Sequence, residues 1–198
     1  MRRVPGGSPV ELSSAARGQL KMIARVQTAL EGAGLCWWLF GGWGLDALLG
    51  RVTREHGDIE VWVAARDATP SRDVLVAAGA EECTTKPVNE SREYLWDQVS
   101  FSTAYYRDRD DGTYGVSGRW DDWVFPGGSF GDDRGHLAGL TVPVMSPEGM
   151  LAMKTQYSSL RNGGPPRDKD LRDIPVLQQL TERSSLDMGP RSESRDRR

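Results

Sequence analysis

Two short apolar segments separated by a glycine pair constrain the fold of this chain more than any other feature. Residues 35–40 form a continuously apolar run, which is typical of a buried central strand. Gly41-Gly42 follows at once, and residues 43–49 predict a short helix that Gly50 closes. Residues 58–63 then alternate between two sets of side chains, which predicts a second strand. A strand, a helix and a strand in this order indicate a sheet covered by helices.

The rest of the chain supplies further elements around this unit. An apolar stripe at helical spacing runs through residues 13–30, and Ser146-Pro147-Glu148 is a typical helix start. The chain therefore falls in the α/β (α+β) class, with a mixed β-sheet packed with helices and a helical C-terminal segment. Helices are predicted at 13–30, 67–79, 146–160 and 167–181, strands at 82–86, 95–106 and 140–144, and hairpins or a covering loop at 114–130.

The length of 198 residues suits a single domain. Both ends of the chain are polar and lack apolar periodicity. We therefore expect a flexible N-terminus at residues 1–10, one folded domain at 11–182 and a disordered tail at 183–198.

Composition and charge exclude several classes of protein. Lys and Arg number 25 against 28 Asp and Glu, a net charge of −3, so we expect no nucleic-acid partner. No apolar run reaches the roughly 18 residues of a membrane span, and no secretory signal is visible, so a cytoplasmic protein without a membrane partner is expected. Cys36 and Cys83 are too few for a disulfide framework, and Cys36 is expected to be a buried thiol.

The second strand carries two carboxylates on one face. Residues two apart in a strand point to the same side, so Asp58, Glu60 and Trp62 share a face, with the Asp58 and Glu60 alpha carbons about 6.7 Å apart. Paired oxygen ligands at this spacing suit Mg²⁺, although an isolated Asp-x-Glu is more often an ordinary solvated strand face. The preceding Gly41-Gly42 strengthens the functional interpretation, because bare backbone N–H groups at a helix start can approach a phosphate.

The complete pattern resembles a known superfamily. Residues 41–60 combine Gly-Gly-Trp, a short helix, Leu-Gly-Arg-x-Thr-Arg-x-His and Asp-Ile-Glu. This block is similar to that of the polymerase-beta-like nucleotidyltransferases, and within them to the small adenylyltransferases that modify lincosamides or aminoglycosides. The likeness extends over roughly residues 20–180 and includes the Ser-Pro-Glu helix start at 146–148 and the Lys-Asp-x-x-Asp sequence at 169–173.

The resemblance implies roles for particular residues. Asp58 and Glu60 would hold Mg²⁺ against the triphosphate of ATP or another nucleotide, and pyrophosphate would be the leaving group. Gly41 and Gly42 would cradle the β- and γ-phosphates. Arg54 and Lys154 would contribute positive charge to the nucleotide-binding site.

Each of these basic residues also has a structural interpretation. Arg54, like Arg51, could be a surface arginine paired with Glu55. Lys154 could be an exposed helix lysine. For His56, local hydrogen bonding is the leading interpretation and a role in the site is the alternative.

Two departures from the family pattern bear on activity. The second acid is Glu60 where the family usually has Asp, and the extra methylene moves its oxygens by about 1.5 Å in a site where Mg²⁺ demands near-octahedral geometry. A third acid is expected on the strand at 95–106, where the alignment places Ser100. Serine is no general base near neutral pH without help.

These features lead to one principal hypothesis and two alternatives. The principal one is Mg²⁺-dependent transfer of a nucleoside monophosphate, AMP from ATP, to a hydroxyl of a small antibiotic-like molecule. Trp120, Trp123 and Phe125 would form a wall of the acceptor pocket, or simply pack on the sheet. The first alternative is a degenerate member that binds nucleotide or ligand without efficient transfer, and the second is transfer to protein or RNA. The oligomeric state is left open.

Overall fold

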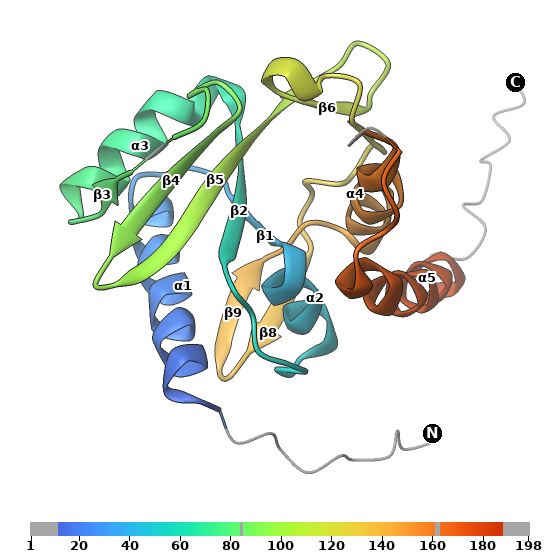
Figure 1. Cartoon of the computed structure of the whole chain (residues 1–198), viewed down its shortest axis with the longest axis horizontal. Coiled ribbons are helices and arrows are strands. Elements are labelled where there is room, and N and C mark those ends of the chain that lie inside the picture. Colours follow the sequence, from blue (N-terminus) through green and yellow to red (C-terminus); the bar gives the residue numbers. More distant parts are fainter. Residues whose placement is uncertain (1–11, 84, 161–162, 188–198) are drawn as a thin grey trace, which may run out of the picture.

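A mixed β-sheet forms the centre of the molecule, which the computed structural model describes over residues 12–83, 85–160 and 163–187 (Figure 1). The strands lie in the order β1-β2-β5-β4-β3, and β6 and β7 extend the sheet from β5. β2 and β5 run parallel, whereas the other pairs are antiparallel, so the predicted mixed sheet is confirmed. The strands are β1 Trp38–Phe40, β2 Ile59–Ala64, β3 Glu81–Glu82, β4 Ser91–Trp96, β5 Val99–Asp108, β6 Tyr114–Val116 and β7 Val124–Phe125. Residues 1–10 and 188–198 of the expected loose ends lie outside the described residues.

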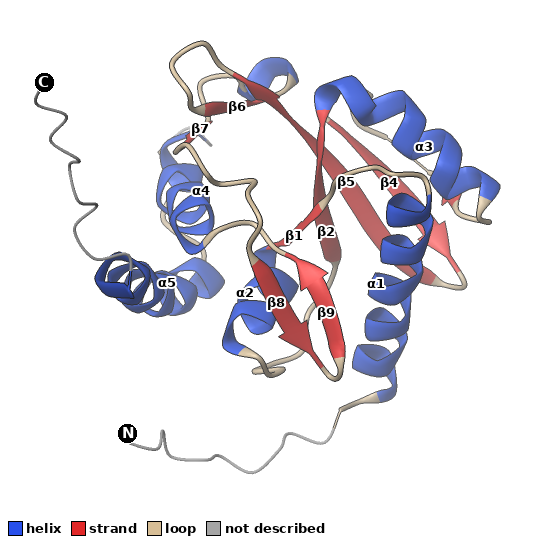
Figure 2. Cartoon of the chain, turned by 180° about the vertical axis from the view of Figure 1, so that it is seen from behind, coloured by secondary structure: helices blue, strands red, loops and turns tan. Residues whose placement is uncertain are grey.

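Two helices cover one face of the sheet. α1 (Ser14–Gly32) begins at Ser13, whose Oγ accepts a hydrogen bond from the Ala16 N–H. The predicted apolar stripe of α1 is buried, and α1 lies beside α3 (Ala68–Ala77) against the sheet (Figure 2). In the part of the chain that the structure describes, no helix combines the length and apolar character needed to span a membrane.

Three further helices lie toward the β1 edge of the sheet. α2 (Gly41–Leu49) follows β1 directly, and Gly50 ends it in the left-handed conformation, as predicted. α4 (Pro147–Leu160) starts after Ser146, also as predicted, and packs against α5 (Asp168–Asp187) (Figure 1). α5 continues past its predicted end at residue 181.

β1 differs from its prediction in length and position. It holds only residues 38–40 and lies at the end of the strand order rather than in its centre. It is nevertheless buried. The strands β8 (Arg134–Leu137) and β9 (Leu140–Pro143) form a separate two-stranded sheet, and Val144, directly after β9, pairs with Leu39 of β1 and covers its free edge. Cys36 precedes β1 in the link from α1, and its side chain is exposed instead of buried.

The predicted strand at 95–106 is in fact a hairpin. β4 and β5 are joined by Asp97 and Gln98, which both have positive φ, at 47° and 63°. Two central residues of this conformation form the tight turn that suits twisted strands. Two-residue hairpin turns usually carry Asn-Gly or Asp-Gly, and this turn carries Asp-Gln, so the sequence did not predict it. Arg25 of α1 forms an ion pair with Asp97 and lies over the Trp96 ring, which holds the turn against α1.

Aromatic side chains pack on the face of β2 that also carries Glu60. Trp62, which shares a face with Glu60, is 2% exposed and packs on Phe40, Phe125 and Phe130. The face that carries Glu60 is therefore not an ordinary solvated strand face.

Close packing of α2 against β8 gives a test of the fold. A Cβ on Gly135 would lie 2.6 Å from the Ala47 Cβ and 2.7 Å from its carbonyl carbon, so Gly135→Ala should lower the free energy of unfolding by about 2 kcal/mol. Gly32→Ala is the control, because a Cβ there meets nothing within 4 Å. Urea unfolding should give a lower midpoint for Gly135→Ala alone, and equal midpoints would contradict this packing.

Candidate active site

The glycine pair lies where β1 becomes α2, and both glycines are required by close contacts. Gly41 has φ +68°, and a Cβ there would lie 2.5 Å from Glu60 Oε2. A Cβ on Gly42 would collide with the His56 ring. The N-cap residue, Phe40, makes no side-chain cap hydrogen bond, and the side chains of Glu60, His56 and Arg54 lie close to the helix start. Backbone N–H groups at the start of a helix favour the approach of an anion.

The two predicted acidic residues lie at the start of β2. Asp58 is exposed and precedes the strand, whereas Glu60 is half-buried within it. Burial raises the pKa of Glu60, and the charge of Asp58 raises it further, while Lys169, Lys154 and Arg167 act in the opposite direction. Burial and the repulsion between the two negative charges therefore oppose ionisation of both carboxylates at once, unless a cation bound between them compensates the charge.

This donor set fits Mg²⁺. The ion prefers carboxylate oxygens and is usually held by one or two of them together with substrate phosphates. Gly41 leaves room for the longer side chain of Glu60 to fold against the helix start, which accommodates its extra methylene. Among the described residues no group of three or more His, Cys, Asp or Glu side chains forms a metal cluster, so Asp58 and Glu60 would act as a pair.

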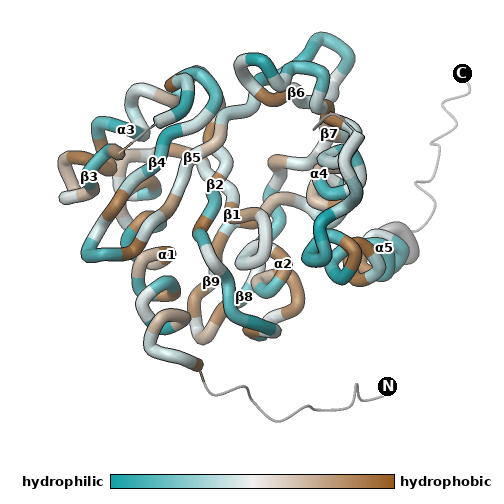
Figure 3. Tube along the Cα trace, viewed as in Figure 1, coloured by the Kyte–Doolittle hydropathy of each residue, from teal (hydrophilic) through white to brown (hydrophobic). Residues whose placement is uncertain are grey.

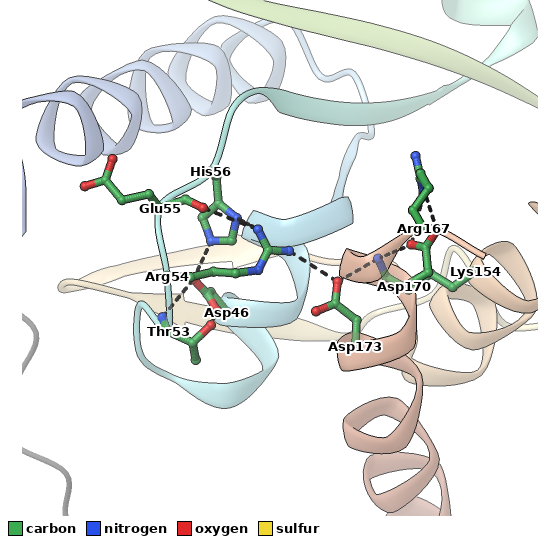
Figure 4. Close-up of polar contacts among 9 residues, drawn as sticks. All are labelled: Asp46, Thr53, Arg54, Glu55, His56, Lys154, Arg167, Asp170 and Asp173. Atoms are coloured by element: carbon green, nitrogen blue, oxygen red, sulfur yellow. Dashed lines mark hydrogen bonds and ion pairs between the residues drawn. The ribbon is translucent and has the colours of Figure 1, made fainter. Parts of the chain in front are cut away.

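A polar network fixes the segment between α2 and β2 (Figure 4). This segment is hydrophilic along most of its length (Figure 3). Asp46 Oδ2 accepts from the Thr53 N–H at 3.0 Å and lies 2.6 Å from His56 Nε2. Arg54 Nη1 lies 3.0 Å from His56 Nδ1. Arginine only donates, so His56 accepts at Nδ1 and donates to Asp46 from Nε2 as a neutral imidazole. This confirms the local hydrogen-bonding role predicted for His56.

The same network reaches the C-terminal helices (Figure 4). Arg54 Nη2 lies 3.2 Å from Asp173 Oδ2. Lys154, 3% exposed, places Nζ 2.8 Å from Asp173 Oδ2 and 3.2 Å from Asp170 Oδ1. Arg167 bonds Asp170 through two nitrogens, at 2.5 and 3.0 Å. Lys154 is therefore not an exposed helix lysine, and Arg54 pairs with an acid of α5 rather than with the Glu55 carboxylate.

A cavity of about 430 Å³ opens between the sheet and these helices. Gly41, Gly42, Arg54, Glu60 and Lys154 all line it, so the structure brings these predicted residues together, while Asp58 lies two residues before Glu60. Trp120 and Trp123 also line the cavity, whereas Phe125 is fully buried in the core. Lining residues that sequence reasoning did not assign to the site are Lys86, Glu90, Arg119, Tyr157, Arg167 and Lys169.

Strand register corrects the position expected for the third acid. Ser102, not Ser100, lies beside Glu60, because β2 and β5 pair Glu60 with Ser102. Ser100 is exposed near the hairpin turn, opposite Leu95. Ser102 in turn pairs with Glu93 of β4, whose pKa is lowered by a hydrogen bond from Lys86 at 2.7 Å. The row Glu60–Ser102–Glu93 thus has an acid at each end and a hydroxyl between them.

The raised pKa of Glu60 predicts a stability that depends on pH. A carboxyl with a raised pKa in the folded state costs stability once it ionises, so the cost appears as pH rises above the ordinary value of 4.5. Without Mg²⁺, Glu60→Gln should raise the melting temperature at pH 7 by roughly 2–4 °C, about 1 kcal/mol, and should have little effect at pH 4. Exposed Glu31→Gln is the control. A lower melting temperature of Glu60→Gln at pH 7 would contradict this account.

Lys154 should be important for stability because its charge is buried between acids. Lys154→Met keeps the apolar stem but leaves Asp173 and Asp170 with one cation fewer, which should cost about 3 kcal/mol of unfolding free energy. Lys21→Met, at an exposed position of α1, should change it by less than about 0.5 kcal/mol. Chemical denaturation of the two variants gives their free energies of unfolding. Similar decreases in both would contradict a stabilising role of the buried ion pairs of Lys154.

Comparisons with known proteins agree with this geometry. A family model described as aminoglycoside-2''-adenylyltransferase matches residues 22–177. The 2''-aminoglycoside nucleotidyltransferases of Escherichia coli and Klebsiella pneumoniae are 44% identical over 43 residues, a segment that spans 22% of this chain and about a quarter of theirs.

Solved structures show the same fold. The solution structure of the antibiotic-resistance factor ANT(2'')-Ia matches with a TM-score of 0.64 at 18% identity, over 87% of this chain and 89% of that one. The lincosamide adenylyltransferase LnuA, bound to lincomycin, matches with a TM-score of 0.55 at 21% identity, over 82% and 96%. Together with the family match, the glycine pair, the paired acids and the sheet that positions them show that this chain belongs to the aminoglycoside-2''-adenylyltransferase family.

Proposed function

We propose that the protein transfers AMP from ATP to a hydroxyl group of a small antibiotic-like molecule, with Mg²⁺ bound by Asp58 and Glu60. The observation that carries the proposal is the contact between Gly41 and Glu60. It puts a carboxylate within van der Waals reach of bare backbone at a helix start, inside a cavity. An acid alone would repel phosphate at such a site, whereas an acid with a divalent cation would bind it.

Positive charge surrounds the same end of the cavity. Arg54, Lys154, Arg167 and Lys169 all line it, and three of these act electrostatically on Glu60. A triphosphate with its metal ion matches this combination of cations and a helix start. Acids of α5 partly neutralise Arg54 and Lys154, which would hold the two cations in place before a nucleotide binds.

The transfer is a displacement at phosphorus. The acceptor hydroxyl oxygen forms a bond to the α-phosphorus, and the bond from that phosphorus to the bridging oxygen breaks. Pyrophosphate leaves, and the proton of the hydroxyl passes to water. The residues of the chain mainly orient the reactants and neutralise charge, as is general for phosphoryl transfer. The cations at the helix start would stabilise charge on the departing pyrophosphate. When bound, Mg²⁺ would supply further neutralisation of the phosphate oxygens.

One observation favours the alternative of a member that binds without efficient transfer. Ser102 lies beside Glu60 where the resemblance leads us to expect a third acid. A serine hydroxyl is a poor proton acceptor near neutral pH. Turnover therefore distinguishes the two functions, since both include nucleotide binding.

Pyrophosphate release tests the proposal directly. With ATP, Mg²⁺ and a panel that includes lincomycin and tobramycin, acceptor-dependent release should occur and should fall at least about 100-fold in Asp58→Asn, because a metal-binding charge is lost. Asp73→Asn, at an exposed position of α3, should leave release unchanged. Calorimetric binding of ATP–Mg²⁺ without any release would support the binding-only alternative, and no binding would contradict both.

A further inference from the structure

The cavity extends along the face of the sheet, away from the glycine pair. Ser91 of β4 pairs with Ala104 of β5, which in turn pairs with Trp62 of β2. This row lies two residues along the strands from Glu60, so strand geometry places the alpha carbons of Glu60 and Ser91 about 12 Å apart. Glu90 directly precedes Ser91, and both line the cavity. The part of the cavity around Glu90 is called the distal end below.

Glu90 is a buried carboxylate that its surroundings hold in one position. Its side chain is 7% exposed, and its backbone N–H donates to the Pro87 carbonyl at 2.9 Å. Gly118, with φ +79°, packs against this side chain, since a Cβ there would lie 2.5 Å from Glu90 Cγ. A buried carboxylate is costly unless a cation or several hydrogen-bond donors accompany it. Glu90 therefore forms a cation site at the distal end.

The cation beside Glu90 is an exposed side chain. Arg119 Nε lies 3.2 Å from Glu90 Oε1, but the Arg119 side chain is 66% exposed. Its guanidinium also lies 5.0 Å from the centre of the Trp120 ring, which belongs to the same loop between β6 and β7. An ion pair with so exposed a member contributes little free energy, because water competes for that member. The acid of this pair is fixed, whereas its cation can move into solvent.

The other charged pair near the distal end already matches one acid with one cation. Lys86 Nζ lies 2.7 Å from Glu93 Oε1, and Glu93 also accepts a hydrogen bond from Thr85 Oγ1 at 3.2 Å. With both pairs counted, the two carboxylates are balanced by two cations. A cationic ligand therefore gains a carboxylate here only by displacing a cation of the chain. Of the two pairs, Glu90 and Arg119 both line the cavity, so the exchange is expected there.

Two hydrogen-bond donors that line the cavity lack partners. The Nε1 atoms of Trp62 and Trp123 are buried, and neither has a hydrogen-bond partner within the described part of the chain. An indole N–H only donates, so a hydroxyl oxygen of a bound molecule would satisfy it. A ligand with ammonium groups and hydroxyl groups on one scaffold would satisfy Glu90 and the indoles together.

We propose that Arg119 occupies the position that an ammonium group of the acceptor takes on binding, and that the acceptor must displace Arg119 from Glu90. This inference rests on the proposed function and concerns affinity for the acceptor rather than transfer. Arg119 is then an internal competitor, which keeps Glu90 paired until an ammonium group replaces it. An acceptor without an ammonium group cannot make this exchange, so the pair also favours cationic acceptors.

Removal of the competitor tests the proposal. Calorimetry of the full chain with tobramycin, which carries several amino groups, should give a dissociation constant about 3-fold lower for Arg119→Gln than for the parent protein, because tobramycin no longer displaces a cation. Arg17→Gln, at an exposed position of α1, is the control for the loss of one arginine and should bind as the parent does. An unchanged or weaker affinity of Arg119→Gln would overturn the proposal.

A double-mutant cycle separates exchange at Glu90 from general repulsion between positive charges. Glu90→Gln removes the cation site and should raise the dissociation constant of tobramycin about 5-fold. In this background Arg119→Gln should change the constant by less than about 1.5-fold, since the competitor has lost its acid. If Arg119→Gln strengthened binding equally in both backgrounds, Arg119 would act by long-range repulsion and the proposal would be wrong.

Binding of ATP–Mg²⁺ shows whether the variants keep the rest of the cavity intact. The glycine pair lies away from the distal end, so the affinity for ATP–Mg²⁺ should be the same in the parent, Arg119→Gln and Glu90→Gln. Loss of this affinity in Arg119→Gln would show that Arg119 supports the structure of the cavity, which would rule out its role as a competitor.

These binding measurements also separate failure of this inference from failure of the proposed function, because none of them requires turnover. Tighter binding of tobramycin by Arg119→Gln would support the inference even if ATP and tobramycin released no pyrophosphate, a result that would contradict only the proposed transfer. No binding of tobramycin by the parent or by Arg119→Gln would overturn the inference, whether or not ATP–Mg²⁺ binds.

Discussion

A continuous chain of buried and half-buried polar and charged groups joins the sheet side of the cavity to the C-terminal helices. It runs from Asp46 through His56 and Arg54 to Asp173 and Lys154, and each member has a partner of complementary charge or hydrogen-bonding character. Buried charges are costly unless they are paired, so the partners specify one arrangement of the segments that carry them. The positions of the glycine pair, the second acid and the cationic helices relative to one another all depend on this chain of contacts.

The two glycines and Glu60 show how the cavity combines close packing with unfavourable electrostatics. Gly41 and Gly42 have no side chains, so Glu60 and His56 can approach the helix start more closely than any other residue would permit. The approach buries Glu60 near Asp58, which raises the pKa of Glu60. The fold tolerates this cost because the aromatic side chains that pack on Trp62 of β2 and the ion pairs of α4 and α5 hold the strand and the helices in place. Such local cost is common where a protein binds charged ligands.

The parts of the fold that the sequence predicted are those with local physical causes. Apolar spacing together with residues typical of helix ends predicted the positions of α1, α2 and α4. The alternation of side chains along residues 58–63 predicted the position of β2. Tertiary contacts determine the features that it missed. The Asp97-Gln98 turn is held by contacts with α1, and β1 is buried by the segment after β9 rather than by a central position. In the site, the block at 41–60 located the acids and glycines, but Glu90 and Arg119 meet only through folding and had no local signal.

The contact between Arg54 and Asp173 joins residues 119 positions apart. During synthesis the chain emerges from its N-terminus, so the first strands, the glycine pair and both acids are available long before their C-terminal partners. Contacts of such long sequence separation form late, since the intervening chain must first be ordered. The Glu60 end of the cavity can therefore reach its final form only after Asp173 has been made. Every shorter nascent chain would have the acids and the glycines without the α5 carboxylates that hold Arg54 and Lys154 in position.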